Sequence, residues 1–283
     1  MTDTAWPQDR IGDPARNGDA SPPIRLPDAF TVNFGDASVL SEFCLRADRV
    51  FEAAGIDLYL TRDLIELKRV NEMNLDSWFP LFPVFDVAYG GANPDNSYFI
   101  YGIDRANGEI VATVAGRTYL MSSLSEKVRS LELYYPDPAA QAAAGEWSCY
   151  SGEAAAAADL IKGRVVMSGA GWFKPNSARG RGFAKILPRL SRAYARATWG
   201  TDFTVSMVKR PHIELGIARA YGYTRVAQTW HWSSPWAEES HIFEAPVDLV
   251  WMPAEELEAD LGARNRADAS SQHVRISLSA AAD

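Results

Sequence analysis

The chain has 283 residues, of which 47% are hydrophobic and 23% charged, values typical of a globular protein with one large core or two smaller ones. Its formal net charge of −8 argues against a protein that binds nucleic acids non-specifically, because such proteins carry an excess of basic residues. The two cysteines, Cys44 and Cys149, are too few for a disulfide framework or a cysteine zinc site.

The N-terminal sequence has no secretory pattern. About the first 25 residues contain several aspartates and no continuous apolar stretch, which argues against a signal peptide. No later run reaches the length of a membrane span. We therefore expect a cytoplasmic protein with reduced, at least half-buried cysteines and with no membrane, nucleic-acid or metal partner.

The first segments predict an arm followed by two helices and a strand. Residues 1–37 are rich in Pro, Asp, Gly and Asn, which predicts a flexible arm. Apolar residues then recur at helical spacing over 38–54 until Gly55, and residues 56–60 alternate like a half-buried strand. A second helix is expected over 64–75.

An aromatic segment, 78–85 (WFPLFPVF), is interrupted by Pro80 and Pro83. It fits a plug of core side chains beneath a loop. It fits equally well the wall of a substrate pocket, since pockets are lined mostly by apolar and aromatic residues. The sequence leaves both interpretations open.

The clearest local pattern is a β-hairpin, with strands 98–104 and 109–121 joined by a turn at Ala106-Asn107-Gly108. Residues 122–162 are less regular, and an insertion is the simplest explanation for them. The alanine run 154–158 within this insertion predicts a short, exposed helix.

The second half of the chain begins with strand 165–173, whose consecutive apolar residues predict a central place in the sheet. A helix of about four turns is expected to follow from Gly182, and Pro188 inside it predicts a kink. The later elements are shorter. In order, we predict strand 202–208, helix 211–221, strands 223–232 and 242–251, and helix 255–261.

These elements are expected to form one domain, 38–262, which contains the insertion at 122–162. A polar tail, 263–283, follows the domain. Apolar residues alternate over 274–278, which would suit an edge strand.

The most informative stretch joins strand 165–173 to the helix after it. Residues 179–182 (RGRG) combine glycine with positive charge directly before a helix N-terminus, whose free N–H groups and dipole favour an anion such as phosphate. The G-x-x-x-x-G-K-[ST] phosphate loop is absent, and Lys185 stands where a dinucleotide fingerprint requires a third small residue. The pattern that fits is R-x-x-G-x-A, at 179–184.

This pattern resembles the acyl-CoA-binding signature of the GNAT acetyltransferase superfamily, in which loop amides hold the CoA pyrophosphate. A second similarity lies in the helix that ends at Ala218-Arg219-Ala220-Tyr221-Gly222-Tyr223. The order of the predicted elements over 55–251 is also that of the family, with the region after the hairpin as an enlargement. The resemblance implies an α/β (α+β) GNAT fold, with a mixed, mostly antiparallel central sheet flanked by helices.

The resemblance also implies a CoA-dependent N-acyltransferase. Such an enzyme moves acetyl from acetyl-CoA, or another acyl group from its CoA thioester, to a small primary amine by direct attack in a ternary complex. The family binds the pantetheine arm where pairing breaks between the strand before the loop and the strand after the helix. Gly169 and Gly171 would suit a bulge and a ligand there. The positions that match the family's cofactor site are Trp172, Phe173, Lys174, Arg179, Gly180, Arg181, Gly182, Phe183, Ala184 and Lys185.

Two departures from the family concern catalysis. Ala218 stands where a tyrosine often serves as general acid, and Tyr221 lies about one helical turn further on. His212, after Pro211, replaces the asparagine common at the start of that helix, and a histidine exchanges protons near neutral pH. His212 and Tyr221 are the candidate catalytic residues, and His212 is the preferred acid. The base is left to a water molecule or to one of the acidic residues Asp86, Glu214 and Glu244.

Other functions stay open. An acyl-homoserine-lactone synthase shares the fold, and 96–119 resembles its hairpin, whereas 179–184 favours the CoA-type loop. A catalytically inactive domain that binds CoA esters would explain the missing acid and base, and an α/β domain unrelated to CoA would bind none. The sequence does not identify the acceptor. Tryptophans near the C-terminus could line its pocket or belong to the core or to a homodimer interface: Trp230, Trp232, Trp236 and Trp251.

Overall fold

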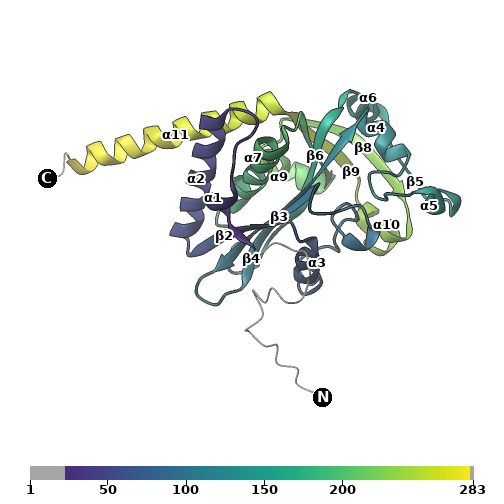
Figure 1. The fold of residues 1–283 in the computed structure, drawn as a ribbon, viewed down its shortest axis with the longest axis horizontal. Coiled ribbons are helices and arrows are strands. Elements are labelled where there is room, and N and C mark those ends of the chain that lie inside the picture. Colours follow the sequence, from purple (N-terminus) through teal and green to yellow (C-terminus); the bar gives the residue numbers. More distant parts are fainter. Residues whose placement is uncertain (1–22, 281–283) are drawn as a thin grey trace, which may run out of the picture.

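The computed structural model of the chain describes residues 23–280, with side chains as far as residue 267. Its centre is one nine-stranded sheet in the order β1-β2-β3-β4-β6-β7-β9-β8-β5, with helices on both faces (Figure 1). Every neighbouring pair of strands is antiparallel except β6 and β7. The predicted fold class, a mixed and mostly antiparallel sheet flanked by helices, is therefore confirmed.

The strands are β1 (Ile24–Arg25), β2 (Ile56–Thr61), β3 (Ser97–Asp104), β4 (Ile110–Met121), β5 (Trp147–Tyr150), β6 (Gly163–Phe173), β7 (Phe203–Lys209), β8 (Arg225–Ser233) and β9 (Val247–Pro253). The α-helices are α1 (Leu26–Ala29), α2 (Ala37–Ala53), α3 (Leu64–Glu72), α4 (Leu124–Arg129), α5 (Ala139–Ala143), α6 (Gly152–Leu160), α7 (Leu187–Trp199), α8 (Arg210–Glu214), α9 (Ile217–Tyr221), α10 (Pro235–Glu239) and α11 (Ala254–Ala280). The 3-10 turns are η3 (Val87–Tyr89), η4 (Phe183–Lys185) and η5 (Ile242–Glu244).

The sheet separates two apolar cores. On one face α2, α7 and the first turns of α11 pack together, with Leu40, Leu190 and Leu257 fully buried. On the other face α3, α4, α6, α10 and the 78–85 segment form a second core, which contains Phe85 and Trp230. Successive side chains of a strand point to opposite faces, so both cores draw on the same strands.

The elements predicted over 38–121 are confirmed. Helix α2 begins after Asp36, whose Oδ1 accepts a hydrogen bond from the Val39 N–H at 3.0 Å. It ends before Gly55, which has a φ of +78°. The β3–β4 hairpin turns at Gly108, which has a φ of +73°.

The N-terminal and C-terminal segments differ from the predictions. Ile24 and Arg25 pair with β2, and Leu26 is fully buried, so these residues belong to the fold and not to an arm. Residues 1–22 lie outside the described part of the chain. At the other end, α11 continues through 263–280 and runs away from the sheet (Figure 1), so the edge strand predicted over 274–278 is a helix instead.

The insertion at 122–162 is more ordered than predicted. It contains α4, α5, β5 and α6, and β5 extends the sheet by pairing with β8. Helix α6 includes the alanine run, but Ala154 and Ala158 are buried, because this face of the helix packs on the second core. The prediction of a fully exposed helix is therefore wrong.

The predicted kink at Pro188 is absent. Helix α7 begins at Leu187, so Pro188 lies in its first turn, where the missing N–H has no helical partner to lose. The turn η4 occupies the preceding residues. The predicted helix 211–221 is split into α8 and α9 at Gly216, which has a φ of +78°.

Candidate active site

The two parallel strands β6 and β7 part near the middle of the sheet. Only three residues of each are paired: Val165 with Phe203, Val166 with Thr204, and Met167 with Val205. Beyond this point β6 stays with β4 and β7 stays with β9. We call the space between 168–173 and 206–209 the wedge. Within residues 23–280, no strand pairs with the backbone edges that face it.

A bulge in β6 lies beside the wedge. The register against β4 shifts between the pairs Ala115–Gly169 and Thr113–Trp172, so β6 has one extra residue there. Ala170 has a φ of +51°, and its carbonyl accepts a hydrogen bond from Thr113 Oγ1 at 2.9 Å. The bulge expected from the glycines at 169 and 171 is present.

The loop after β6 leaves a run of backbone N–H groups unused. The Lys174 carbonyl accepts hydrogen bonds from the N–H groups of Ala178 and Arg179, both at 3.1 Å. In the described part of the chain, the N–H groups of 180–184 donate to no other residue. Gly180 and Gly182 both have a φ of +83°, and a Cβ added at either would meet nothing within 4 Å. The loop therefore presents free donors to an open surface, as an anion site requires.

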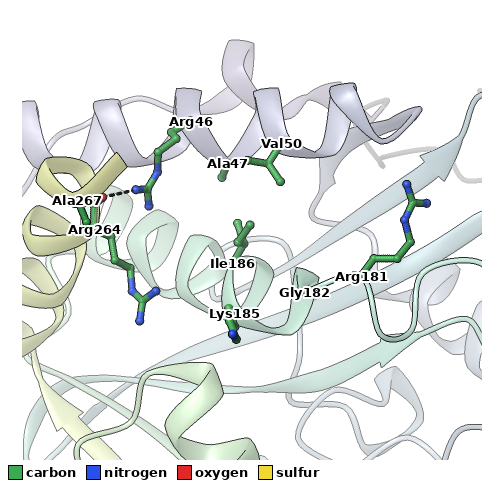
Figure 2. A pocket seen from close by; sticks show the side chains of 9 residues that line it. All are labelled: Arg46, Ala47, Val50, Arg181, Gly182, Lys185, Ile186, Arg264 and Ala267. Atoms are coloured by element: carbon green, nitrogen blue, oxygen red, sulfur yellow. Dashed lines mark hydrogen bonds between the residues drawn. The ribbon is translucent and has the colours of Figure 1, made fainter. Parts of the chain in front are cut away.

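A basic pocket of about 300 Å³ lies next to this loop (Figure 2). Helix α2 covers one side of it, the η4 turn and the start of α7 form the floor, and α11 closes one end. Four cations line it, and four apolar side chains add a non-polar surface. The cations are Arg46, Arg181, Lys185 and Arg264, and the apolar residues are Ala47, Val50, Ile186 and Ala267.

The cations that the sequence placed near the loop have different surroundings. Arg179 and Lys185 are exposed. Arg181 donates to the carbonyls of Ala54 and Ser177 at 3.1 and 3.2 Å, which ties the loop to the end of α2. Arg189 is only 1% exposed, and its Nε pairs with Asp260 at 2.6 Å.

Arg46 and Arg264 were missed by the sequence analysis. They come from α2 and α11, and they meet because the Arg46 Nη1 donates to the Arg264 carbonyl at 2.5 Å. Arg264 also contacts Asp260 at 3.2 Å. No local motif marks either residue, since the pocket is formed by packing between helices that lie about 200 positions apart in the sequence.

Tyr221 lies beside the wedge. A Cβ built on Gly171 would be 3.6 Å from the Tyr221 hydroxyl, so this hydroxyl lies against the bulged part of β6. Burial raises the pKa of Tyr221, and the nearby Tyr223 raises it further. Two buried arginines of α7 hold the end of α9 in place: Arg192 donates to the Tyr221 carbonyl and Arg189 to the Ala220 carbonyl.

His212 is half-buried in α8, three positions after the last residue of β7. The start of this helix is fixed by Arg210, which forms two hydrogen bonds of 2.8 and 2.9 Å with the buried Asp248. Ile213 and Tyr221 both pack on a small core of Ala218, Tyr223 and Val250. Helices α8 and α9 therefore carry both candidate catalytic residues to one side of the sheet.

The first residues of the predicted cofactor site have structural partners. Trp172 is buried, stacks on Trp78 at 5.3 Å and donates from Nε1 to Ser77 at 3.2 Å. Phe173 is half-buried, and Lys174 pairs with Glu109 at 2.7 Å. Any contact of Trp172 with a ligand in the wedge is consequently left to its backbone.

Both interpretations of the 78–85 segment find support in different residues. Val84 and Phe85 are buried, and a Cβ on Gly169 would be 2.5 Å from Phe85, so these residues plug the core. Phe79, in contrast, is 51% exposed, and the Lys209 ammonium lies 4.2 Å from its ring centre. This pair places an aromatic side chain at the open end of β7.

The C-terminal tryptophans belong mainly to the core. Trp230 and Trp232 are 1% and 4% exposed, and Trp236 stacks on Trp232 at 5.3 Å. Trp236 also donates to the Leu81 carbonyl at 3.2 Å. Of the acids considered as bases, Asp86 is bound by Lys68 at 2.9 Å, and Glu244 contacts His241 at 3.2 Å.

No protein-family model matches the chain, and no curated protein matches it either. Solved structures do resemble it. FeeM, an N-acyl amino acid synthase from uncultured soil microbes, matches 69% of this chain and 84% of its own, with 10% identity and a TM-score of 0.37. A mutant form of the spermidine/spermine N-acetyltransferase SpeG from Vibrio cholerae matches 72% and 96%, with 8% identity and a TM-score of 0.41.

The aminoglycoside acetyltransferase AAC(6')-Ib, solved in complex with coenzyme A and kanamycin, matches 72% of this chain and 98% of its own. Its identity is 12% and its TM-score 0.38. All three structures have low identity and a low TM-score against this chain. Within residues 23–280, no helix is long and apolar enough to cross a membrane.

Proposed function

We propose that this chain is a CoA-dependent N-acyltransferase that transfers an acyl group, acetyl in the simplest case, to a small primary amine. The observation that carries the proposal is the position of the loop. Its free N–H groups at 180–184 lie in the loop that follows β6. The C-terminal part of the same strand, 168–173, borders the wedge. A ligand with an anionic end and a long, thin arm fits this combination, and a CoA thioester has both.

Each part of the ligand then has a place. The diphosphate accepts hydrogen bonds from the loop amides, and the pantetheine arm runs along the unpaired edge of β6. The nucleotide end lies in the basic pocket, where the apolar surface of Ala47, Val50 and Ile186 suits a base and the cations suit a phosphate.

The reaction needs no covalent enzyme intermediate. A neutral amine attacks the thioester carbonyl, the C–S bond breaks, and the amine loses a proton while the thiolate gains one. His212 and Tyr221 are candidates for handling these protons, since α8 and α9 lie beside the wedge. The names of the similar structures suggest polyamines, aminoglycosides and amino acids as acceptors to test.

Substitution of the loop glycine tests CoA binding. Gly182→Val places a β-branched side chain at a φ of +83°, where it distorts the backbone that presents the free amides. We expect isothermal calorimetry to show at least tenfold weaker CoA binding. Gly145→Val is the matched control, because Gly145 also has a positive φ and open space but lies between α5 and β5, away from the loop. Equal CoA affinity in the two variants would overturn the proposed site.

Turnover separates the enzyme from its alternatives. Acetyl-CoA and longer acyl-CoA thioesters are incubated with spermidine, kanamycin and free amino acids, and the release of thiol and the formation of amide are followed. Amide formation identifies an N-acyltransferase and its acceptor class. CoA binding without turnover on any amine would favour the inactive CoA-binding domain. If the protein does not bind CoA, the N-acyltransferase and the inactive CoA-binding domain are both excluded.

A further inference from the structure

A short segment crosses the wedge on the face of the sheet that carries the second core. Trp78 stacks on Trp172 of β6, with ring centres 5.3 Å apart. The next residue, Phe79, lies against Lys209, the last residue of β7, whose ammonium is 4.2 Å from the ring centre. Two consecutive residues thus contact the two strands that border the wedge. These contacts place the segment at the entrance to the wedge on this face, whereas Phe183 of the glycine-rich loop packs in the core on the other face.

Lys209 faces the same side of the sheet as this segment. Val205 and Met207 pack on the second core, and Lys209 is the next alternate residue of β7. Met167 and Val205 form the last β6–β7 pair, so Lys209 lies four residues, or about 13 Å, beyond this pair. Gly171 lies the same number of residues along β6. Lys209 therefore lies across the wedge from the bulged part of β6.

The Lys209 ammonium is held in place without an anion. Its Nζ donates to the His241 carbonyl at 3.2 Å, and among the described residues no carboxylate forms an ion pair with it. Burial lowers the pKa of Lys209, while the charge of Glu244 acts in the opposite direction and is the smaller of the two effects. A carboxylate that binds here compensates a partly desolvated charge and meets a donor whose position is already fixed.

We propose that the acceptor is an amino acid whose carboxylate binds the Lys209 ammonium. The proposal deepens the proposed N-acyltransferase function and rests on it. With the carboxylate held at the end of β7, the amino group reaches into the wedge toward the thioester that lies along β6. The new C–N bond forms as the C–S bond breaks, and the amine loses one proton while the thiolate gains one. The sum is acyl-CoA plus amino acid giving N-acyl amino acid plus CoA thiol.

The same geometry disfavours a polycationic acceptor. Spermidine and kanamycin carry several ammonium groups, which the Lys209 ammonium repels at short range. Two acids on this side of the sheet do not offset this repulsion. Asp86 is already paired with Lys68 at 2.9 Å. The Glu244 side chain is 70% exposed and contacts His241 at 3.2 Å, so water and salt screen its charge.

Calorimetry tests the carboxylate without turnover. Protein saturated with CoA is titrated with phenylalanine, whose ring suits the 51% exposed Phe79, with phenylalaninamide, in which an uncharged group of similar shape replaces the carboxylate, and with spermidine. We expect phenylalanine to bind about tenfold more tightly than either, the usual contribution of a hydrogen bond between charged groups. Equal affinity for phenylalanine and its amide, or tighter binding of spermidine, would overturn the inference.

Variants at Lys209 assign the effect to one side chain. Lys209→Met should weaken phenylalanine by about tenfold and leave phenylalaninamide and CoA within about twofold of wild type. Lys209→Arg should keep most of the preference for phenylalanine, because the charge remains. Lys162→Met, at an exposed lysine just before β6, is the matched control and should bind all ligands like wild type. Equal weakening of phenylalanine and its amide in Lys209→Met would mean that Lys209 only supports Phe79, and the inference would fail.

Turnover gives a second readout. With acetyl-CoA, Lys209→Met should raise KM for phenylalanine by about tenfold and leave kcat nearly unchanged, because the carboxylate is bound equally in the ground state and the transition state. A loss confined to kcat would contradict the binding role. The two proposals fail separately. A wild-type protein that binds no CoA would overturn the proposed function and this inference with it, whereas CoA binding without any preference for the carboxylate would overturn this inference alone.

Discussion

Arg117 is a buried cation on the face of the sheet opposite α7. It is 5% exposed, its Nη1 donates to the Val84 carbonyl at 3.2 Å, and its guanidinium lies 4.8 Å from the ring centre of Tyr119. Its Nε has no hydrogen-bond partner in the described part of the chain. Burial lowers the pKa of Arg117, and among the described residues no carboxylate forms an ion pair with it. Shape and one hydrogen bond therefore hold the 78–91 loop here, at the cost of desolvating a charge.

Two substitutions at Arg117 separate volume from charge. Arg117→Ala leaves a cavity under the loop, and we expect it to lower the free energy of unfolding by about 3 kcal/mol. Arg117→Met keeps most of the volume and removes the buried charge, so it should stay within about 1 kcal/mol of wild type. Urea denaturation followed by circular dichroism measures both. Equal losses in the two variants would show that the hydrogen bond to Val84 outweighs the packing.

At the scale of elements, α7 and α11 together position α9. Arg189 of α7 is buried, pairs with Asp260 of α11 and donates to the Ala220 carbonyl of α9. Gly222 makes this approach possible, since a Cβ there would be 2.5 Å from the Arg189 Cζ. Tyr221, the last residue of α9, is thereby held against the bulged part of β6. A helix outside the range of the family resemblance thus supports the candidate site.

We expect the loss of the Asp260 charge to lower the stability of the fold. Burial tends to raise its pKa, but hydrogen bonds and charges from Arg189 and Arg264 outweigh burial and lower the pKa below 3.8. Asp260→Asn would leave Arg189 buried without an anion, and we expect a loss of about 3 kcal/mol. Glu256→Gln, which changes another acid of α11 and breaks its more exposed pair with Arg225, is the control and should cost about 1 kcal/mol or less.

The pH dependence of the Asp260 effect has a definite sign. A carboxyl whose pKa is lowered by folding stabilises the protein above its unfolded pKa, and this contribution is lost as the pH falls through the lower, folded value. The stability difference between wild type and Asp260→Asn should be constant from about pH 5 to about pH 7, because this window lies above the pH range in which Asp ordinarily titrates. It should shrink below about pH 4. A constant difference down to pH 2 would show that the ion pair is not its source.

The elements also show what the sequence could predict. Alternation located β2, and the turn at 106–108 located β3 and β4, which are buried on both faces, each within a residue or two. The start of α7 was misplaced because the η4 turn, which has no distinctive composition, separates the glycine loop from the helix. The four-residue strand β5 is too short to show a period, and only its pairing with β8 defines it.

The candidate site was predictable to the extent that it is local. The loop at 179–184 was found because one short segment supplies all its amides, and the bulge followed from Gly169 and Gly171. Arg46 and Arg264 were not found, because they come from α2 and α11, which lie far from the loop in the sequence.

The whole molecule carries a net charge of −8, yet four cations from three segments surround one pocket. An anionic ligand is thus repelled by the molecule at long range and attracted at the pocket, and salt weakens both effects. The local attraction should dominate binding once the ligand is in place, because the charges are then within a few ångströms of each other.

Removal of the 3′-phosphate tests this local attraction. Dephospho-CoA should bind about tenfold more weakly than CoA at low ionic strength, since a hydrogen-bonded ion pair contributes about 1.5 kcal/mol. Added salt should reduce the difference in affinity between the two ligands, because the pocket is open to solvent and its charges are screened. Arg46→Ala should also reduce the difference in affinity between CoA and dephospho-CoA. Arg49 is an exposed arginine of the same helix outside the pocket lining, so Arg49→Ala should leave this difference unchanged. Calorimetric titration of both ligands into the three proteins measures these differences. If CoA and dephospho-CoA bind wild type equally at low salt, the phosphate lies elsewhere and the basic pocket is not its site.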